Sequence, residues 1–291
     1  MLWSSTPGAS AGSGRALPES LRRSADRAMR WGDLRKRVLS AAVLAPTALA
    51  CIWLGADAWT ALMAVAAGGL AYEWVRLCSE RPWRMPGLVV PVAVLLSGLA
   101  AVLDRERWAL VVVAAGAGSA WFLSRRSALG AGVVYVGLAS VALVWLRGDG
   151  AAGRANVLFL VVVVWASDIG AYLAGRLLGG PKLAPAISPG KTWSGAAGGL
   201  IAAMLIGEAA GQALAVAAYG RAALIAGLLG MAAQGGDLLE SAIKRRFGVK
   251  DSGHLIPGHG GLLDRLDGLL TAAPTAAALA MVLGRGVVLW Q

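Results

Sequence analysis

The sequence holds 291 residues, 57% of them hydrophobic and only 15% charged, with a formal net charge of +11. This much apolar surface exceeds what one soluble core buries, so the composition excludes an ordinary soluble domain and predicts a polytopic membrane protein. The two cysteines, Cys51 and Cys78, are isolated in or beside apolar segments. Their placement predicts neither a disulfide framework nor a cysteine metal site.

A polar tail comes first, and nine apolar segments follow it. Ser, Gly, Arg and Pro collect near the N-terminus without an apolar period, which predicts a cytoplasmic N-terminal tail over 1–37. A helix needs about 20 mostly apolar residues to cross a bilayer. The sequence therefore predicts an all-α, polytopic integral membrane protein with about nine transmembrane helices, near residues 38–55, 57–75, 86–103, 108–123, 128–146, 155–175, 195–219, 222–243 and 266–284. We assign 38–150 to N-terminal transmembrane helices and 151–291 to a C-terminal transmembrane catalytic region.

The distribution of Lys and Arg predicts the orientation of these segments, because cytoplasmic loops retain positive charge. With the N-terminus inside, 21 of the 27 basic residues fall in the tail and the loops on that side. The basic balance is therefore a signal of topology, and we expect no nucleic-acid partner. The pattern fits a bacterial plasma (inner) membrane, with the N-terminus and both long polar loops in the cytoplasm.

The predicted segment 155–175 carries a carboxylate, Asp168, where insertion into the bilayer costs roughly 2.5–3.5 kcal/mol. Asp168, Tyr172 and Arg176 are spaced i, i+4 and i+8, so they share one helix face that can point into the bundle. This pattern favours the lining of a site. A structural pair between helices is the alternative.

The polar loop that follows ends at a predicted helix N-terminus. It reads SPGKT over 188–192, and free backbone N–H groups with the helix dipole favour phosphate at such a position. Ser188, Lys191 and Thr192 are therefore candidate substrate-binding residues. The Gly-Lys-Thr triplet is not a Walker A loop, because Pro185 stands where that motif needs its first glycine and no strand is expected before it.

The segment 222–243 has one fully polar stripe. Gln234, Asp237, Ser241 and Lys244 recur at i, i+3, i+7 and i+10, with Glu240 beside them. The other faces are apolar and can meet lipid, and a glycine pair within the segment permits close backbone approach. A merely solvated face would have to be wet at membrane depth, so the stripe predicts a polar cavity.

Cations and glycines alternate in the loop between residues 244 and 261. Glycines expose backbone N–H groups to oxyanions, and Lys and Arg add charge, so the loop predicts a triphosphate site. His254 and His259 are not at helical spacing, and metal-assisted phosphoryl transfer does not need them, so we interpret both as positioning residues. The candidate contacts are Lys244, Arg245, Lys250, His259, Gly260 and Gly261.

The last apolar segment opens with two carboxylates, Asp264 and Asp267, at i and i+3 on one helix face, where they can meet Asp237. Clustered carboxylates repel one another unless a cation lies among them. Hard oxygen ligands suit Mg²⁺ bound together with nucleotide phosphates. We therefore expect a divalent metal held by Asp237, Asp264 and Asp267.

The stretch 241–267, SAIKRRFGVKDSGHLIPGHGGLLDRLD, resembles the full signature of phosphatidate cytidylyltransferases: S-x-x-K-R, then K-D, then P-x-H-G-G-x-x-D-R-x-D. SDIGAY around Asp168, SPGKTWSG around Lys191 and GDLLES from Gly236 resemble the other characteristic blocks of that family. The resemblance covers residues 155–270.

This resemblance implies an enzyme of phospholipid biosynthesis that converts CTP and phosphatidic acid to CDP-diacylglycerol and pyrophosphate. It implies a metal centre at Asp237 and Asp264, containing Mg²⁺ and a monovalent cation such as K⁺. It further implies a homodimer in membrane lipid, with a polar funnel open to the cytoplasm.

For that reaction we expect an oxygen of the lipid phosphate to attack the α-phosphorus of CTP in line. No general base is needed, because a phosphate monoester is already ionised near pH 7. Asp168 and Tyr172 would line the cavity. The expected catalytic residues are Asp237, Asp264, Asp251 and Lys244, and the expected phosphate contacts are Lys191, Lys244, Arg245, Lys250 and Arg265.

Three alternatives stay open on the sequence. A CDP-alcohol phosphotransferase shares the start of a D-x-x-D-G motif at Asp264, Asp267 and Gly268, but the rest of that motif is absent. A CTP-dependent lipid kinase would release CDP in place of pyrophosphate, so product analysis separates it. A transporter also uses broken helices with buried charge, and it would move substrate without nucleotide turnover.

Overall fold

The computed structural model describes residues 42–148, 150–214, 220–253, 255, 260–284 and 286–290. Within these ranges the chain is helical apart from one two-stranded hairpin, which confirms the predicted all-α class. The predicted tail over 1–37 and both histidines lie outside the described residues.

Most of the N-terminal half packs around one buried cluster, whereas Ile52, Trp59 and part of 142–146 belong to a second. Residues Ala42–Leu54 are helical and lead into α2 (Ala56–Leu77), α3 (Val89–Val102), α4 (Glu106–Ser124) and α5 (Ser127–Gly148). Trp74 on α2 anchors this half: its ring lies against Tyr135, and its indole N–H donates to the Ala128 carbonyl over 2.8 Å. A buried indole that finds a hydrogen-bond partner packs without a desolvation penalty.

The C-terminal half comprises α6 (Gly150–Leu178), a hairpin of β1 (Lys182–Ala184) and β2 (Ser188–Thr192), α7 (Trp193–Leu214), α8 (Arg221–Arg246) and α9 (Leu263–Leu283). The two strands pair antiparallel. Helices α6 and α7 meet along small residues: a methyl group at Gly170 would collide with Ala202, and one at Gly198 with Ala174. Small residues that let backbones approach closely are the usual basis of helix association in membranes.

Within the described ranges, six helices are long and apolar enough to cross a membrane, namely α4 to α9. Residues Ala42–Leu54 and α3 are apolar but shorter than a span. Helix α2 has sufficient length, yet it carries Asp57, Glu73 and Arg76 and is not among the six. The described residues therefore support a polytopic helical membrane protein with six candidate spans.

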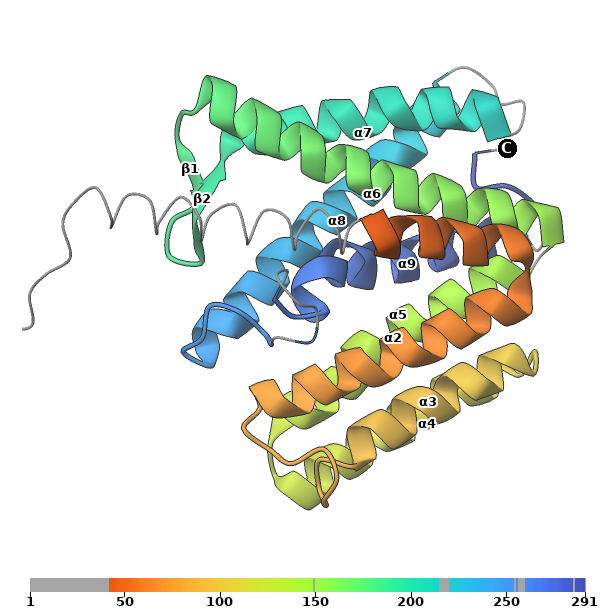
Figure 1. Ribbon diagram of the computed structural model, residues 1–291, viewed down its shortest axis with the longest axis vertical. Helices are drawn as coiled ribbons and strands as arrows, with labels where there is room; N and C mark the ends of the chain where they lie inside the picture. Colours follow the sequence, from red (N-terminus) through yellow and green to blue (C-terminus); the bar gives the residue numbers. More distant parts are fainter. Residues whose placement is uncertain are drawn as a thin grey trace, which may run out of the picture.

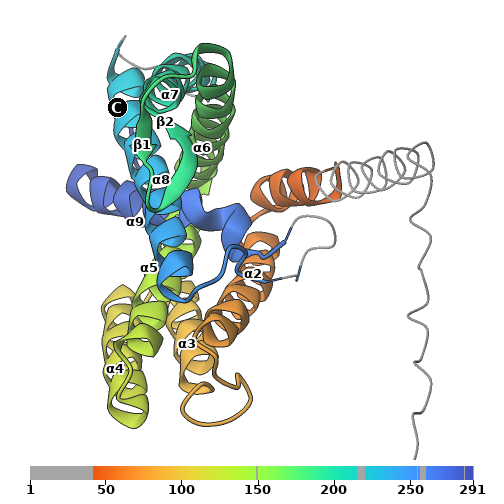
Figure 2. The same ribbon diagram turned by 90° about the vertical axis from the view of Figure 1, so that its left-hand side faces the viewer.

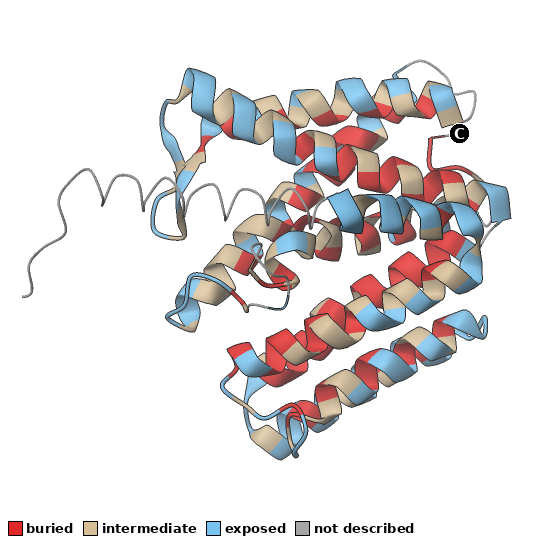
Figure 3. Ribbon diagram, viewed as in Figure 1, coloured by how far each residue is buried: buried red, intermediate tan, exposed pale blue. Residues whose placement is uncertain are grey.

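The basic connections predicted to share one side lie at one end of the helices (Figure 1). They are the α2–α3 and α4–α5 connections, the hairpin between α6 and α7, and the α8–α9 loop. Figure 3 shows exposed residues along the hairpin and the α8–α9 loop at this end, whereas α5 and the first half of α6 are largely buried.

The opposite end of the helices is stabilised by hydrogen bonds and by aromatic stacking between buried groups. The Arg147 guanidinium on α5 donates twice to the Ile52 carbonyl, over 2.7 and 2.9 Å. The chain after α9 folds back into the core, where Trp290 is fully buried and stacks on Phe159 with ring centroids 4.3 Å apart. These contacts fix the end of the bundle that lies away from the polar loops.

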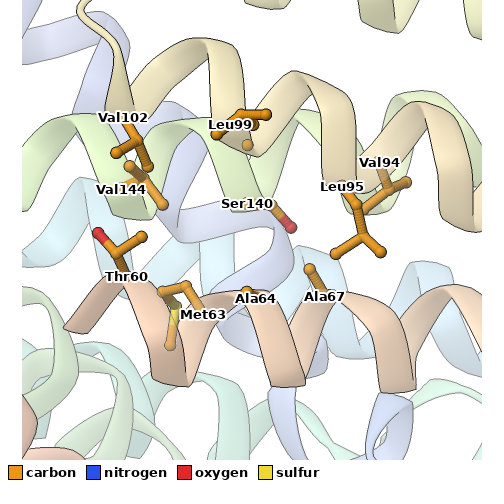
Figure 4. A pocket seen from close by; sticks show the side chains of 11 residues that line it. Thr60, Met63, Ala64, Ala67, Val94, Leu95, Leu99, Val102, Ser140 and Val144 are labelled. Carbon is orange, nitrogen blue, oxygen red and sulfur yellow. The ribbon is translucent and has the colours of Figure 1, made fainter. Parts of the chain in front are cut away.

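An apolar cavity of about 240 Å³ lies between α2, α3 and α5 (Figure 4). Met63, Ala67, Val94 and Leu99 contribute to its lining, and Ser140 is one of its few polar residues. The Ser140 hydroxyl is already bonded to the Val136 carbonyl. The cavity is lined almost wholly by apolar side chains, whereas the charged residues predicted to form the site lie on α6 to α9 and their connections.

Candidate active site

The predicted polar stripe of α8 faces neighbouring helices. The Gln234 side-chain amide donates to Ser167 Oγ on α6 and to the Ala196 carbonyl on α7, each over 3.2 Å. Gly236 lies so close to α9 that a Cβ there would sit 2.5 Å from the Asp267 carbonyl oxygen. The glycine at 236 therefore provides the close approach expected of it, whereas Gly235 has open space around it.

Asp264 is the centre of the α8–α9 loop. Its Oδ2 accepts hydrogen bonds of 3.0 Å from the Ser252 amide, the Ser252 hydroxyl and the Gly261 amide. Its Oδ1 lies 2.5 Å from Lys244 Nζ. A carboxylate with this many donors, two of them backbone amides, fixes the path of the loop around itself.

Two glycines make this path possible. Gly260 has φ +85, a left-handed conformation that glycine adopts at little cost. A Cβ at Gly261 would collide with Ser252 Oγ, so only glycine can bring its amide to Asp264 here. The predicted role of both glycines in exposing backbone N–H groups is thus directed, for Gly261, at a carboxylate of the protein.

Lys244 joins α8 to α9 by pairing with two carboxylates. Its ammonium lies 2.5 Å from Asp264 Oδ1 and 3.2 Å from Glu240 Oε2. The Lys244 side chain is 12% exposed, and the Glu240 and Asp264 side chains are 2% and 9% exposed. One enclosed ammonium pairs with both carboxylates and so offsets part of the cost of burying them side by side.

The hairpin brings a second lysine to α8. Lys191 Nζ on β2 lies 2.6 Å from Asp237 Oδ2, and both side chains are partly exposed. Arg245 Nε donates to the Ile187 carbonyl over 3.1 Å and so holds the tip of the hairpin beside the end of α8 (Figure 2). Arg245 also donates to the Val249 carbonyl, which means that this predicted phosphate contact positions both polar loops.

The other predicted hairpin residues differ in exposure. Thr192 is buried, and its hydroxyl accepts the Gly195 amide over 3.1 Å, the geometry of a helix cap at the start of α7. Ser188 opens β2 and is half-buried. The predicted location at a helix N-terminus is confirmed for the Thr192 hydroxyl, whereas Ser188 lies at the start of β2, in a hairpin that was not predicted.

Three carboxylates from three helices lie close enough to interact electrostatically. Asp267 on α9 lies within electrostatic reach of Asp237 on α8 and of Asp168 on α6, and Asp168 also interacts with Lys191. Along the same face of α6, Arg176 donates to the Tyr172 hydroxyl over 2.6 Å. The predicted sharing of a helix face by Tyr172 and Arg176 is confirmed. This face is exposed in the structure and does not point into the bundle as predicted: Tyr172 is 61% exposed, and Asp168 and Arg176 are exposed as well.

The carboxylates fit a divalent cation unequally. In the described part of the chain, no group of three His, Cys, Asp or Glu side chains is arranged to hold a metal ion. Asp237 has one described ion pair and a side chain that is 38% exposed, so its oxygens are accessible. Both oxygens of Asp264 are occupied by protein donors, which leaves it less room to bind a metal.

Three further predicted residues lie on the exposed rim of the site. Lys250 and Asp251 are exposed in the α8–α9 loop, and Arg265 is exposed in the first turn of α9. His259 lies outside the described residues. The rim therefore presents long cationic side chains next to the Asp264 loop, as a site for a polyanion requires.

Comparison with known proteins identifies the group to which this arrangement belongs. The model of the Cytidylyltransferase family matches residues 35–283. The chain belongs to the cytidylyltransferase family. Among its curated relatives, the phosphatidate cytidylyltransferase of Brucella suis is 42% identical over 247 residues, which cover 83% of this chain and 91% of that protein. The enzymes of that name from Pseudomonas aeruginosa and Bacillus subtilis are 37% and 39% identical over 272 and 142 residues, covering 87% and 48% of this chain and 99% and 53% of those proteins.

Two residues of this cytidylyltransferase site were not predicted from the sequence. Ser252 donates twice to Asp264, and the buried Glu73 on α2 accepts the Leu263 amide over 2.9 Å. Glu73 carries the same signal as Asp168, a carboxylate inside an apolar segment. This signal indicates that the carboxylate has a partner, but it does not indicate which residue the partner is. For Glu73 the partner lies 190 positions away in the sequence.

Proposed function

We propose that this member of the cytidylyltransferase family is a phosphatidate cytidylyltransferase, which converts CTP and phosphatidic acid to CDP-diacylglycerol and pyrophosphate. The observation that carries the proposal is the Asp264 cluster, in which Lys244, Ser252 and Gly261 of the signature stretch meet one carboxylate. The names of the relatives from Brucella suis and Pseudomonas aeruginosa support the same substrates.

In the proposed reaction, an oxygen of the lipid phosphate attacks the α-phosphorus of CTP. A new phosphorus–oxygen bond forms while the bond to the bridging oxygen breaks, and pyrophosphate leaves with that electron pair. The lipid phosphate is ionised near pH 7, so the chain does not need to remove a proton from it. Its contribution is to hold the two substrates in line and to supply positive charge where negative charge accumulates.

Lys191 is the cation best placed to meet a phosphate. It lies on an exposed hairpin, its side chain is 25% exposed, and it is near both Asp237 and Asp168. We assign further phosphate contacts to the rim cations and to the loop backbone, and further substrate contacts to Asp168 and Tyr172. The full proposed set of contacts comprises Ser188, Thr192, Lys191, Arg245, Lys250, Arg265, His259, Gly260 and Gly261.

Magnesium is the expected cofactor, and a monovalent cation such as K⁺ stays a prediction beside it. When bound, Mg²⁺ would neutralise the phosphates and assist the departure of pyrophosphate. Asp237 would hold it, with Asp267 as the neighbouring carboxylate. Asp264 would join them only if Lys244 withdrew from its Oδ1. Asp251 would support the loop or its cations from the rim.

The finer membrane placement is also proposed. Nine spans would require the shorter helices Ala42–Leu54 and α3, together with α2, to cross the bilayer with the six candidate spans. The gathering of basic connections at one end supports a cytoplasmic site in a bacterial inner membrane. We further propose a homodimer, in keeping with the resemblance.

A product assay tests the proposed function. Purified protein in detergent micelles is given radiolabelled CTP, phosphatidic acid and Mg²⁺, and CDP-diacylglycerol and pyrophosphate are both quantified. We expect equal amounts of both products, and loss of both when EDTA chelates the metal. Asp264→Asn should lower the rate at least about 100-fold, because the asparagine amide cannot accept all the hydrogen bonds that the Asp264 carboxylate accepts. Glu208→Gln, a carboxylate variant near the far end of α7, should retain activity. Release of CDP alone would indicate a lipid kinase, and no turnover would refute the proposal.

A further inference from the structure

The α8–α9 loop rests on a helix from the other half of the molecule. A Cβ at Gly69 on α2 would lie 3.0 Å from Leu262 Cδ2 and 3.1 Å from Leu255 Cδ2, so the backbone of α2 packs directly against the loop. One turn further along α2 is Glu73, which is 2% exposed. A buried carboxylate needs donors to offset its desolvation.

The loop supplies a donor. Glu73 Oε2 accepts the Leu263 amide over 2.9 Å, at the first residue of α9. An N-terminal helix amide is one of the groups that lack a partner within the helix, and the helix dipole favours a carboxylate beside it. Because Leu263 immediately precedes Asp264, this bond sets the backbone from which the Asp264 side chain projects.

Glu73 also lines the backbone on both sides of the loop. A Cβ at Gly253 would lie 2.7 Å from Glu73 Oε1, and one at Gly261 would lie 2.9 Å from Glu73 Oε2. Gly253 follows Ser252, and Gly261 itself donates to Asp264. The Glu73 carboxylate therefore lies beside Gly253 and Gly261 and accepts a hydrogen bond from the Leu263 amide. These three residues form or adjoin the backbone around Asp264.

We infer that Glu73 is a positioning residue for the reaction: it fixes the loop around Asp264 in the form that receives the nucleotide. This inference rests on the proposed function. It gives the N-terminal half a part in catalysis, because α2 then determines the geometry of a loop that belongs to the C-terminal half. The nucleotide need not touch Glu73 for this role.

The test compares Glu73→Ala and Glu73→Gln with Glu208→Ala in the purified enzyme. Glu208 is the matched control, because it accepts the Ala223 amide at the start of α8 over 3.0 Å but lies far from the loop. We expect Glu73→Ala to lower kcat by about 10- to 100-fold and to raise the KM for CTP, the usual cost of displacing a group that orients a site. Glu73→Gln should recover most of both, since its amide oxygen still accepts the Leu263 amide. Loss of folded protein alone would lower kcat and leave KM unchanged.

A coupling experiment gives a second readout. Gly253→Ala places a methyl group against Glu73 and should impair the wild type, but it should cost little in the Glu73→Ala background, where the space is open. Hydrogen exchange over residues 250–266 should rise in Glu73→Ala and stay unchanged in Glu208→Ala, and this holds whichever reaction the protein catalyses. An unchanged KM and unchanged exchange in Glu73→Ala, or additive effects in the double variant, would overturn the inference. If the wild type makes no CDP-diacylglycerol, the proposed function fails while the exchange result still stands.

Discussion

Two lysine–aspartate pairs of this protein differ in burial, and this difference predicts opposite consequences of losing each lysine. Lys244 is enclosed with Glu240 and Asp264, whose side chains are 2% and 9% exposed. Lys191 pairs with Asp237 at side-chain exposures of 25% and 38%. Removing one partner of a buried pair leaves an uncompensated charge, whereas water compensates a partly exposed one.

We therefore expect Lys244→Met to lower the free energy of unfolding by about 3 kcal/mol, near the lower end of the 3–5 kcal/mol typical for a buried pair. The lower end applies because Asp264 keeps its donors from Ser252 and Gly261. Lys191→Met should cost under about 1 kcal/mol while still lowering activity through the lost phosphate contact. The two variants should thus separate stability from catalysis.

Denaturation in mixed micelles, followed through tryptophan fluorescence, measures both stabilities. A double variant carrying Glu240→Gln with Lys244→Met provides the control, because only Asp264 then lacks its cation. It should regain about 1–3 kcal/mol relative to Lys244→Met alone, the coupling expected of residues in one network. Equal destabilisation by Lys244→Met and Lys191→Met, or no recovery in the double variant, would refute the reasoning.

Other contacts give further predictions. Gly236→Ala should destabilise by about 1–3 kcal/mol, because its methyl group would collide with α9, whereas Gly235→Ala has open space and should be neutral or slightly stabilising; thermal unfolding of the pair distinguishes them. Asn156→Ala should cost about 1–3 kcal/mol and expose the C-terminal segment to carboxypeptidase, because the Asn156 amide group bonds the Val287 carbonyl and the Leu289 amide. Retention of the C-terminal residues in digested Asn156→Ala would contradict the second expectation.

The sequence predicted the helical class, the site helices and most of the polar residues that meet there. Helical spacing was sufficient for the stripe of α8, because residues at i, i+3 and i+7 share a face whatever packs against it. It was also sufficient to place Asp267 near Asp237, whereas the structure shows Asp264 bound by Lys244, Ser252 and Gly261. These inferences depend on local geometry alone.

Partners across the bundle could not be predicted in this way. The spacing of the α8 stripe did not predict that Gln234 would bond residues of α6 and α7. It also did not predict that Lys244, expected to bind phosphate, would pair with Asp264. Short strands such as β2 are also poorly marked, because a Gly-Pro-rich run reads as a loop. Here Arg245 holds the Ile187 carbonyl from outside the hairpin.

Glu73 shows what a single sequence can supply at such a position. An acidic residue in an apolar segment costs several kcal/mol unless it is paired, so its presence indicates a donor somewhere in the fold. Segment 57–75 contains Asp57 at its beginning, where water or the helix N-terminus can compensate it, and Glu73 near its end. Identifying the donor as the Leu263 amide required the packing of α2 against the loop, and that packing is what makes the N-terminal half part of the site.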